Sequence, residues 1–516
     1  MTGGIGKLSR YLLAGASAIG ILAIGTLEAR ATDVQQLEAT LQAMQAQMKQ
    51  LQREVASAKA AAASAQTAAA KASSDGGGGG SDLDLKVKWK GAPEFSSSDG
   101  KFKMKIRGRL NTDYNGIDQD EPITGEGDIS AVELRRARLG VEGVVFYDWK
   151  YKFEVDFAGN DVGIKDAYVA YANWTNADFA ELSEVRLGNQ YVYTSLEQTT
   201  SALFITFMER AAFTEAFLPS GEADRQIGGA ILLGDEHWSL QTGYYGASVG
   251  EGNDIPGQEE FDTDKSAVSV RGTIAPLNRD LDGGVHQVVH LGASYRHREA
   301  GTLNCGFTIC DIGESNEPNA LFQYRARGAD LHLADRFVDT PQFAKADDMF
   351  NLEAALVFGS FSMQGEYAQT DAEGIQPLEN VGVATRVNPT YTGWYVDASW
   401  FITGETRNYE SDEGIFGRTK VINPVYGGNR GWGAWQIAGR YDVIDLSDKS
   451  AAMNFAYGCE LCGEQATWLI GLNWWLTDYT ALKFQYSQSE IKGPISDSNV
   501  NRGADISGFG ARAQVD

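Results

Sequence analysis

Five basic side chains occupy every second position at the start of one segment of this chain. In KFKMKIRGRLNTDY, from Lys101 to Tyr114, cations alternate with apolar residues such as Phe102 and Ile106. Successive side chains of a β-strand point to opposite faces, so these cations would share one face. Neighbours on that face lie about 6.6 Å apart, within the screening length of about 8 Å at physiological salt. The stretch therefore predicts a continuous positive track that small anions could follow.

The charge balance of the whole chain runs against this basic stretch. The 516 residues include 44 Lys and Arg against 69 Asp and Glu, a formal net charge of -25 at pH 7. Many of the acids stand in Gly- and Asn-rich connectors such as EGNDIPGQEEFDTD, which we interpret as solvated loops. We predict no nucleic-acid partner, because binding a phosphate backbone needs a net basic surface.

Enzyme chemistry has little support in the sequence. The scattered Ser and His residues lack a nucleophile elbow. We therefore predict a protein that is not an enzyme and that has no cofactor and no metal. A barrel-embedded lipase is the enzymatic alternative.

The chain begins with a targeting pattern. Lys7 and Arg10 precede an apolar run from Tyr11 to Leu27, and small residues follow in Ala29-Arg30-Ala31. This pattern predicts a signal peptide over residues 1–31. The alternative, a membrane-spanning helix, is disfavoured because the run is short and broken by Gly. The mature chain is therefore expected to leave the cytoplasm.

The four cysteines form two close pairs, Cys305 with Cys310 and Cys459 with Cys462. In an exported chain such pairs predict local disulfides that clip loops. A zinc site built from all four thiolates is an alternative, but the two spacings differ from those of zinc ribbons. A redox CxxC at Cys459 would need a strand-then-helix context that is not apparent.

The segment after the signal peptide has a helical period. From Val34 to Val55 apolar residues recur at spacings of three and four, a three-heptad seam about 33 Å long. We predict a periplasmic coiled coil with an Ala-rich extension over residues 32–72, followed by a flexible Gly-rich linker over residues 73–85. A single amphipathic helix lying on another surface is the alternative, and the polar flanks do not set the number of chains.

Over residues 86–516 the period changes to two. Segments of about nine to thirteen residues alternate apolar and polar side chains, for example from Tyr151 to Phe157. A soluble sheet also alternates, but its strands are usually shorter, whereas about ten tilted residues match an apolar band about 25 Å tall. Aromatic residues gather at segment ends, as in FYDWKY and NWWLTDY, where membrane interfaces would place them. The predicted fold is all-β, a transmembrane antiparallel β-barrel.

The number of alternating segments predicts the width of this barrel. We count about seventeen, whereas a closed single-chain barrel needs an even number, so one segment is expected to be miscounted, in Leu321–Thr340. Either sixteen or eighteen strands would enclose a water-filled lumen rather than a packed interior. The basic face of the first strand must then be the lumen face, because a charge facing lipid costs about 2 to 4 kcal/mol at the bilayer midplane.

Several stretches, in order from about residue 101 to the C-terminus, resemble the family of phosphate-selective porins O and P. The more specific blocks are SLEQTTS with ITFMER, and FITGETRNY with GIFGR; the alternating strands are less specific. The resemblance implies a sixteen-stranded outer-membrane porin, usually trimeric, that passes anions through a lumen lined with Arg and Lys. It also implies that the third loop, here about residues 193–225, folds inward and narrows the lumen.

One departure from the family concerns the strand that enters this loop. The family commonly reads GQFKEPF there, whereas residues 188–194 of this chain read GNQYVYT. Tyr191 thus stands where the family often has a lysine near the constriction. This departure weakens the expectation of phosphate specificity and leaves the expectation of a pore intact.

The predicted anion-binding residues are cations whose alternation places them on the lumen face. Arginine suits this task because its fork meets oxyanions at two points and stays charged. Arginines inside barrels also pair with carboxylates simply to fill the lumen, and Glu142, Glu154, Asp156 and Asp166 have suitable positions. The candidates are Lys105, Arg107, Arg109, Arg136, Arg138, Arg186, Arg296, Arg298, Arg325 and Arg327.

The sequence thus predicts a passive channel for small anions, with phosphate as one candidate solute. We expect a homotrimer embedded in outer-membrane lipid, with the periplasmic coiled coil holding trimers together or contacting the cell wall. One alternative is a general or sugar-permeable porin, for which Tyr168 and Tyr191 are candidate aromatic contacts. Another is an envelope tether in which the coiled coil is the main functional element.

Overall fold

The computed structural model describes part of the chain, the residues from 85 to 516 with gaps. The gaps are 120–126, 161, 176–178, 220–223, 247–264, 282–284, 301–303, 306–307, 310–321, 341–342, 378–383, 428–429, 449–462 and 493–502. The predicted signal peptide, coiled coil and most of the linker lie outside the described residues. So do the two predicted disulfides, because only the backbone of Cys305 is described. None of the helices in the described ranges has both the length and the hydropathy needed to cross a membrane.

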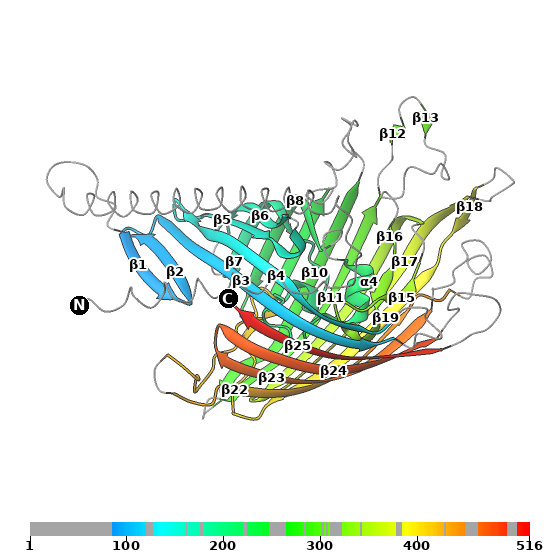
Figure 1. The fold of residues 1–516 in the computed structure, drawn as a ribbon. Coiled ribbons are helices and arrows are strands. Elements are labelled where there is room, and N and C mark those ends of the chain that lie inside the picture. The colour runs from blue at the N-terminus through cyan, green and yellow to red at the C-terminus, as the bar shows by residue number, and fades with distance from the viewer. Residues whose placement is uncertain are drawn as a thin grey trace, which may run out of the picture. The chain divides into compact units, whose positions relative to one another are not determined.

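Within the described residues, sixteen long strands form a closed antiparallel sheet. Each strand pairs with the next, and β25 pairs with β3 to complete the ring; Figure 1 shows red β25 beside blue β3. Closure leaves the ring without an open edge, which a sheet in lipid requires. The strands are β3 (Phe102–Asp118), β4 (Ile129–Val145), β5 (Trp149–Asp156), β6 (Gly163–Ala172), β7 (Leu182–Tyr191), β8 (Arg225–Asp235), β9 (Trp238–Tyr245), β10 (Ser266–Leu281), β11 (Val285–Glu299), β16 (Ala344–Phe358), β17 (Phe361–Pro377), β19 (Thr390–Phe401), β22 (Ala434–Asp445), β23 (Glu464–Thr477), β24 (Thr480–Lys492) and β25 (Ala504–Val515).

The predicted alternation of side chains is confirmed in the wall of the barrel. On β16 and β17 the outward residues include Leu352 and Met363, which are 60% and 42% exposed. The inward residues Glu353 and Glu366 are each 4% exposed. Charged groups on these strands therefore face the lumen, and large apolar groups face the lipid, as the cost of charge in lipid demands.

Aromatic residues on the outer surface form two belts. In the upper belt, cross-strand pairs join Tyr486 with Phe509, Tyr441 with Trp468, and Tyr367 with Trp394. In the lower belt the rings of Trp435 and Trp474 stack 4.9 Å apart, and Phe361 pairs with Trp400. Trp394 and Trp400 stand six residues apart on β19, about 20 Å along a strand. The two belts thus lie on either side of an apolar stretch of the outer wall, the arrangement predicted from the aromatic segment ends.

A short hairpin precedes the ring. It consists of β1 (Leu85–Lys90) and β2 (Ala92–Ser97), and β2 pairs with β3 over Lys103 to Lys105. Here β3 extends past the end of β25, which pairs with β3 only from Leu110 onward. The hairpin therefore continues the wall at the rim where the turns are short, which is the periplasmic rim of an outer-membrane barrel.

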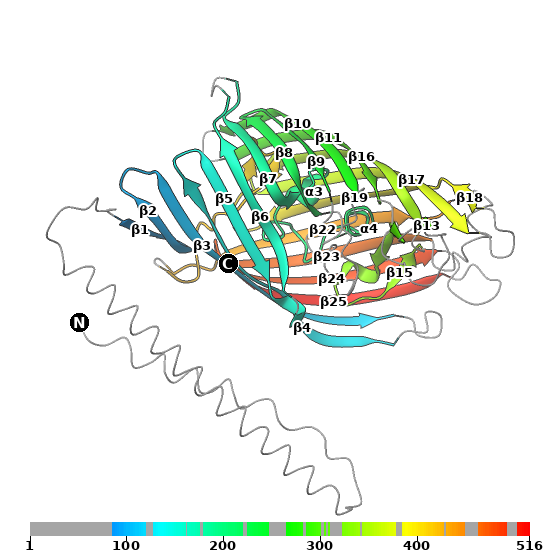
Figure 2. The ribbon, with the colours of Figure 1, turned by 90° about the horizontal axis from the view of Figure 1, so that it is seen from above.

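Two extracellular connections fold into the barrel. The third loop (residues 192–224) joins β7 to β8 and contains α3 (Leu196–Thr199) and α4 (Ala212–Phe217). Residues 322–340, here called the fifth-loop segment, lie between β11 and β16 and contain β14 (Arg325–Arg327), η3 (Gly328–Asp330) and β15 (Arg336–Asp339). Figure 2 shows α4 and β15 inside the ring of strands. The remaining short elements in the loops are η2 (Ala158–Asn160), β12 (Asn304–Cys305), β13 (Thr308–Ile309) and β18 (Ala384–Val387).

The fifth-loop segment resolves the strand count. We counted Leu321–Thr340 among the alternating segments, but β14 pairs with β15 rather than with the wall. Its apolar side chains, Tyr324, Leu331 and Phe337 among them, are buried against α4 and Ile506 of β25. Alternation here reflects a two-stranded packing unit inside the lumen, so sixteen wall strands remain.

A third inward segment comes from the periplasmic rim. Residues 402–433, here called the inner hairpin, join β19 to β22 and contain β20 (Tyr409–Glu410) and β21 (Ile415–Phe416). Phe416 is completely buried in a cluster with Leu196 of the third loop. Instead of a short turn, this connection therefore reaches the middle of the barrel.

Candidate pore constriction

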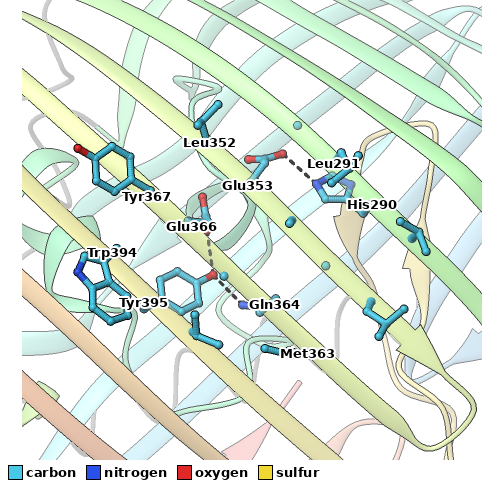
Figure 3. Close-up of a pocket in the computed structure, with 17 residues that line it drawn as sticks. His290, Leu291, Leu352, Glu353, Met363, Gln364, Glu366, Tyr367, Trp394 and Tyr395 are labelled. Atoms are coloured by element: carbon cyan, nitrogen blue, oxygen red, sulfur yellow. Dashed lines mark hydrogen bonds and ion pairs between the residues drawn. The ribbon is translucent and has the colours of Figure 1, made fainter.

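The third loop is held to one side of the barrel by a buried carboxylate of β17. Glu366 accepts hydrogen bonds from the backbone N–H groups of Leu196 (3.0 Å) and Glu197 (2.8 Å). The side chains of Asn351 and Tyr395 also donate to it, at 2.8 and 2.9 Å. In Figure 3 Glu366 and Tyr395 are joined by one of these bonds. Glu366 therefore fixes the start of α3 against the wall.

The tip of the loop is held by a second carboxylate, Glu209. A bulge between β3 and β4 turns both Arg135 and Arg136 toward the lumen, where they bind Glu209 at 2.9 and 3.5 Å. Arg512 of β25 binds Glu209 and also Asp113, each at 2.6 Å. Burial alone would raise the pKa of Glu209, but the three arginines hold it well below its ordinary value.

Further bonds brace the loop along its length. Arg440 of β22 forms ion pairs with Glu197 and with Asp397. Arg210 donates to the backbone carbonyls of Glu197, Gln198 and Thr200, so it supports the loop itself. Of these two neighbouring residues, Glu209 binds side chains of the wall, whereas Arg210 binds the loop's own backbone.

Many of the loop's bonds to the wall are made by β16, β17, β22 and β25. A cavity lies between the loop and the β3 to β8 side of the wall. Its volume is about 260 Å³, and residues of the third loop (Thr199, Ser201, Phe204) and of the inner hairpin (Glu413, Ile415) form one of its sides. Six cations and four carboxylates line it. These are Arg107, Arg109, Arg138, Lys152, Arg186 and Arg225, with Glu142, Glu154, Asp166 and Glu413.

Most of the cavity's cations are paired with carboxylates of the wall. Arg107 lies 2.8 Å from Glu142, and Arg138 lies 2.9 Å from Glu154. Lys152 and Arg225 share Asp166, at 2.7 and 2.9 Å. Arg186 binds Glu184 at 2.7 Å. These pairs balance most of the positive charge on this side of the wall.

Arg109 is the exception among the cations of this cavity. Across the described ranges no carboxylate lies within ion-pair distance of it, and its Nη2 donates only to Ser201 Oγ, at 3.2 Å. Its Nε is buried without a hydrogen-bond partner there. Arg109 on the wall and Ser201 on the third loop thus face each other at the constriction, with cationic N–H capacity left over for an anion.

The structure divides the predicted anion-binding residues by position. Arg107, Arg109, Arg138 and Arg186 line the cavity, whereas Lys105 stands lower on β3, beside Glu94 and Glu142 in the sheet register. Arg136 is 3% exposed beneath Glu209.

The other four candidates lie toward the extracellular side. Arg296 and Arg298 pair with Asp347, and the Arg298 guanidinium lies 3.8 Å from the ring centre of Phe322 in the fifth-loop segment. Arg327 pairs with Glu215 of α4, and Arg325 lies beside it on β14. None of these four lines the cavity, and their contact with permeating ions stays a prediction.

Sequence reasoning missed several lumen cations, Arg271, Arg440 and Arg512 among them. Three others show why. Lys152 shares the parity of Glu154 and Asp156 on β5, so its lumen position was readable from the alternation. Arg225 is the first residue of β8 and was assigned to the loop. Arg135 faces the lumen only because of the bulge, which parity cannot predict. Tyr168 and Tyr191, the candidate aromatic contacts of a sugar-permeable porin, do line the cavity. The guanidinium of Arg186 lies 5.0 Å from the ring centre of Tyr168, and that of Arg225 lies 3.9 Å from the ring centre of Tyr191.

A second hollow, of about 920 Å³, lies on the outside of the barrel over β11, β16, β17 and β19. Figure 3 shows its lining, with Leu352, Met363 and Trp394 on the strands' outer face. These side chains are exposed on the lipid side. The hollow therefore belongs to the membrane-facing surface and is separate from the lumen.

A closed sixteen-stranded barrel with aromatic belts, an inward-folded third loop and a charged constriction defines an outer-membrane porin. A model of the family described as "Phosphate-selective porin O and P" matches residues 104–516, and the chain belongs to this family. Porins are channels, so the protein is not an enzyme.

Two curated relatives are similar over most of the chain. An uncharacterized protein of Caulobacter vibrioides is 29% identical over 83% of this chain and 77% of its own length. Porin O of Pseudomonas aeruginosa is 25% identical over 83% of this chain and 91% of its own length.

Solved structures of other porins are similar at lower identity. An anion-selective porin from Comamonas acidovorans has a TM-score of 0.43 and 14% identity, covering 80% of this chain and 99% of its own. The outer membrane channel DcaP of Acinetobacter baumannii has a TM-score of 0.44 and 12% identity, covering 81% and 99%.

Proposed function

We propose that the protein lets small anions diffuse passively through the outer membrane, with phosphate among the candidate solutes. The observation that carries this proposal is Arg109, a lumen cation at the constriction without a carboxylate partner among the described residues. A lumen cation whose charge is not neutralised by a neighbouring carboxylate attracts anions and repels cations. The paired arginines around it keep the wall hydrated and charged without forming a deep trap, which conduction requires.

The second support is membership in a family described as phosphate-selective. Tyr191 lies in the cavity against Arg225, where the family often has a lysine. The resulting constriction has one cation fewer, and we therefore propose a general preference for anions over a high selectivity for phosphate.

The test is a reversal potential in a planar bilayer under a KCl gradient. We expect the reversal potential to have the sign of a channel in which chloride is more permeable than potassium. Repeating the measurement with potassium phosphate compares the two anions, and we expect phosphate to pass without blocking chloride strongly at equal concentration. A reversal potential of the opposite sign in KCl would contradict the proposal.

We further propose that the channel is a homotrimer whose periplasmic coiled coil supports assembly. The support is the three-heptad seam from Val34 to Val55 and the trimers that the family resemblance implies. Its test is given below with the whole molecule.

A further inference from the structure

The inner hairpin crosses the lumen and is fixed on the far wall by its backbone. Arg271 of β10 donates to the carbonyl oxygens of Glu413 (3.2 Å) and Gly414 (2.7 Å). Gln241 of β9 also donates to the carbonyl of Glu413, at 2.9 Å. Gly414 has a φ of 65°, and a Cβ there would lie 2.5 Å from Thr273 Oγ1. The tip is therefore closely packed, and its position sets where the Glu413 side chain lies.

That side chain projects into the constriction. Glu413 lines the same cavity as Arg109 and is partly exposed. In the described part of the chain, the hydrogen bonds to Glu413 end on its backbone carbonyl, and no ion pair reaches its carboxylate. It differs in this from Glu142, Glu154 and Asp166, which are all paired with cations of the wall.

The charges that face Glu413 are committed to other partners. Arg186 of β7 is bound to Glu184 at 2.7 Å and to the Tyr193 hydroxyl of the third loop at 2.8 Å. Lys152 of β5 is bound to Asp166 at 2.7 Å. On the inner hairpin itself the neighbours Asp412 and Glu410 are also acids. The field at the Glu413 carboxylate is thus offset only in part, and its negative charge remains effective in the pore.

We propose that Glu413 is a specificity-determining residue, whose carboxylate moderates the anion preference set by Arg109 and whose protonation strengthens that preference. The inference rests on the proposed anion channel. With Glu413 ionised the cavity carries six positive and four negative groups; with Glu413 neutral it carries six and three. One unit charge within about 8 Å changes the local concentration of each ion roughly twofold, in opposite directions for anions and cations.

Burial raises the pKa of Glu413, and Asp412 raises it further, while Arg186 opposes the shift. The net direction is upward, so Glu413 becomes neutral at a higher pH than an ordinary carboxylate. As pH falls from about 7.5 toward 5, the cavity gains positive charge. The anion preference should therefore rise on acidification.

The experiment compares wild type with Glu413→Gln in a planar bilayer under a KCl gradient. At pH 7.5 we expect the variant's chloride-to-potassium permeability ratio to be about two- to fourfold higher than that of wild type. On acidification we expect wild type to approach the variant's ratio. The acid-induced rise should be largely lost in the variant, where Glu410 of the same hairpin still titrates. Glu413→Asp should keep the wild-type ratio and its pH dependence, since it keeps the charge.

Glu236→Gln is the matched control, because Glu236 is an exposed acid in the short β8–β9 turn, outside the cavity. We expect it to leave the ratio unchanged. The inference is overturned if Glu413→Gln has the wild-type ratio, or if the acid-induced rise persists in that variant.

If Glu413→Gln does not give a folded barrel, the wild-type titration decides, and a ratio that does not rise on acidification overturns the inference. A channel that prefers potassium both in wild type and in the variant would instead contradict the proposed anion function. The two failures are therefore distinguishable.

Discussion

At the scale of single residues, the arginines of the lumen differ mainly in whether a carboxylate binds them, and less in where they lie. Arg107 and Arg138 line the cavity, yet each is bound to a carboxylate at under 3 Å, at 2.8 and 2.9 Å. Arg109 lies between them in the same wall and donates only to Ser201 in the described part of the chain. A paired arginine holds the wall in shape, and an unpaired one contributes net charge to the pore.

Arg109→Gln tests this distinction. We expect the chloride-to-potassium permeability ratio to fall about two- to fourfold, because one uncompensated positive charge leaves the constriction. The measurement is the reversal potential under a KCl gradient. Lys492→Gln removes the same charge at the extracellular end of β24, where Lys492 is exposed, and should change the ratio far less. Equal effects of the two variants would contradict a special role for Arg109.

At the scale of elements, the constriction depends on how the third loop is docked. The two oxygens of Glu366 accept from two backbone N–H groups of α3 and from two side chains. Hydrogen bonds to a charged acceptor stabilise by about 1.5 to 3 kcal/mol each, and buried N–H groups left unpaired cost a comparable amount. Docking of the start of α3 therefore relies largely on this carboxylate of β17.

Glu366→Gln should loosen the loop. The amide nitrogen replaces one accepting oxygen, so two donors lose their acceptor and docking weakens by about 2 kcal/mol. We expect a larger and noisier single-channel conductance than in wild type. Tyr367→Phe is the control, because Tyr367 is the next residue on β17 and faces the lipid. If Glu366→Gln has the conductance and the low current noise of wild type, other contacts are sufficient to dock the loop, and the prediction is wrong.

The inner hairpin is an element whose docking should depend on pH. Burial, together with the nearby Glu413 and Asp412, raises the pKa of Glu410 to about 7, and Arg418 opposes this shift. A carboxyl group with a raised pKa in the folded state stabilises the docked form at low pH, and this contribution is lost as pH rises from about 4.5 to 7. Amide hydrogen exchange in residues 402–418 should therefore increase from pH 5 to pH 8 by more than the intrinsic exchange rate of an unprotected amide does.

In Glu410→Gln this extra dependence on pH should disappear, since the amide does not ionise. A wild-type difference that persists in the variant would assign the effect to another group. The same measurement on the short β16–β17 turn at Gly359 provides an internal reference within the same protein.

At the scale of the whole molecule, the channel and the predicted coiled coil are separable in sequence. The residues that line the constriction all lie between Arg107 and Ile415, within the part of the chain that the family model matches. Deleting residues 32–82 should therefore leave the single-channel conductance unchanged. The mass in mild detergent should fall from three chains toward one if the predicted coiled coil holds the trimer.

An unchanged trimer after this deletion would remove the assembly role from that segment. Detachment of the outer membrane in cells, with conductance intact, would instead favour the envelope tether. The conductance of the same deletion variant in a planar bilayer is the control that makes both outcomes readable.

The sequence by itself determined the wall of this protein. Each strand of a lipid-embedded barrel must put apolar groups outward and can put charges only inward, so a period of two reveals both faces without knowledge of the neighbours. Lys101 to Tyr114 shows this in one segment, and the FITGE and SLEQTTS blocks indicate the family. The number of wall strands could also be counted from the alternating segments, except at Leu321–Thr340. There a buried two-stranded unit alternates like a wall strand.

Only the tertiary structure decided what the lumen contains. Arg109 meets Ser201 across 92 residues, Arg512 meets Glu209 across 303, and Arg271 meets Glu413 across 142. No local pattern encodes such pairs, because they depend on how far three inward segments reach into the barrel. The net charge of a pore comes from the lumen cations and carboxylates that are not paired with each other. Which of them pair is decided by the folded chain.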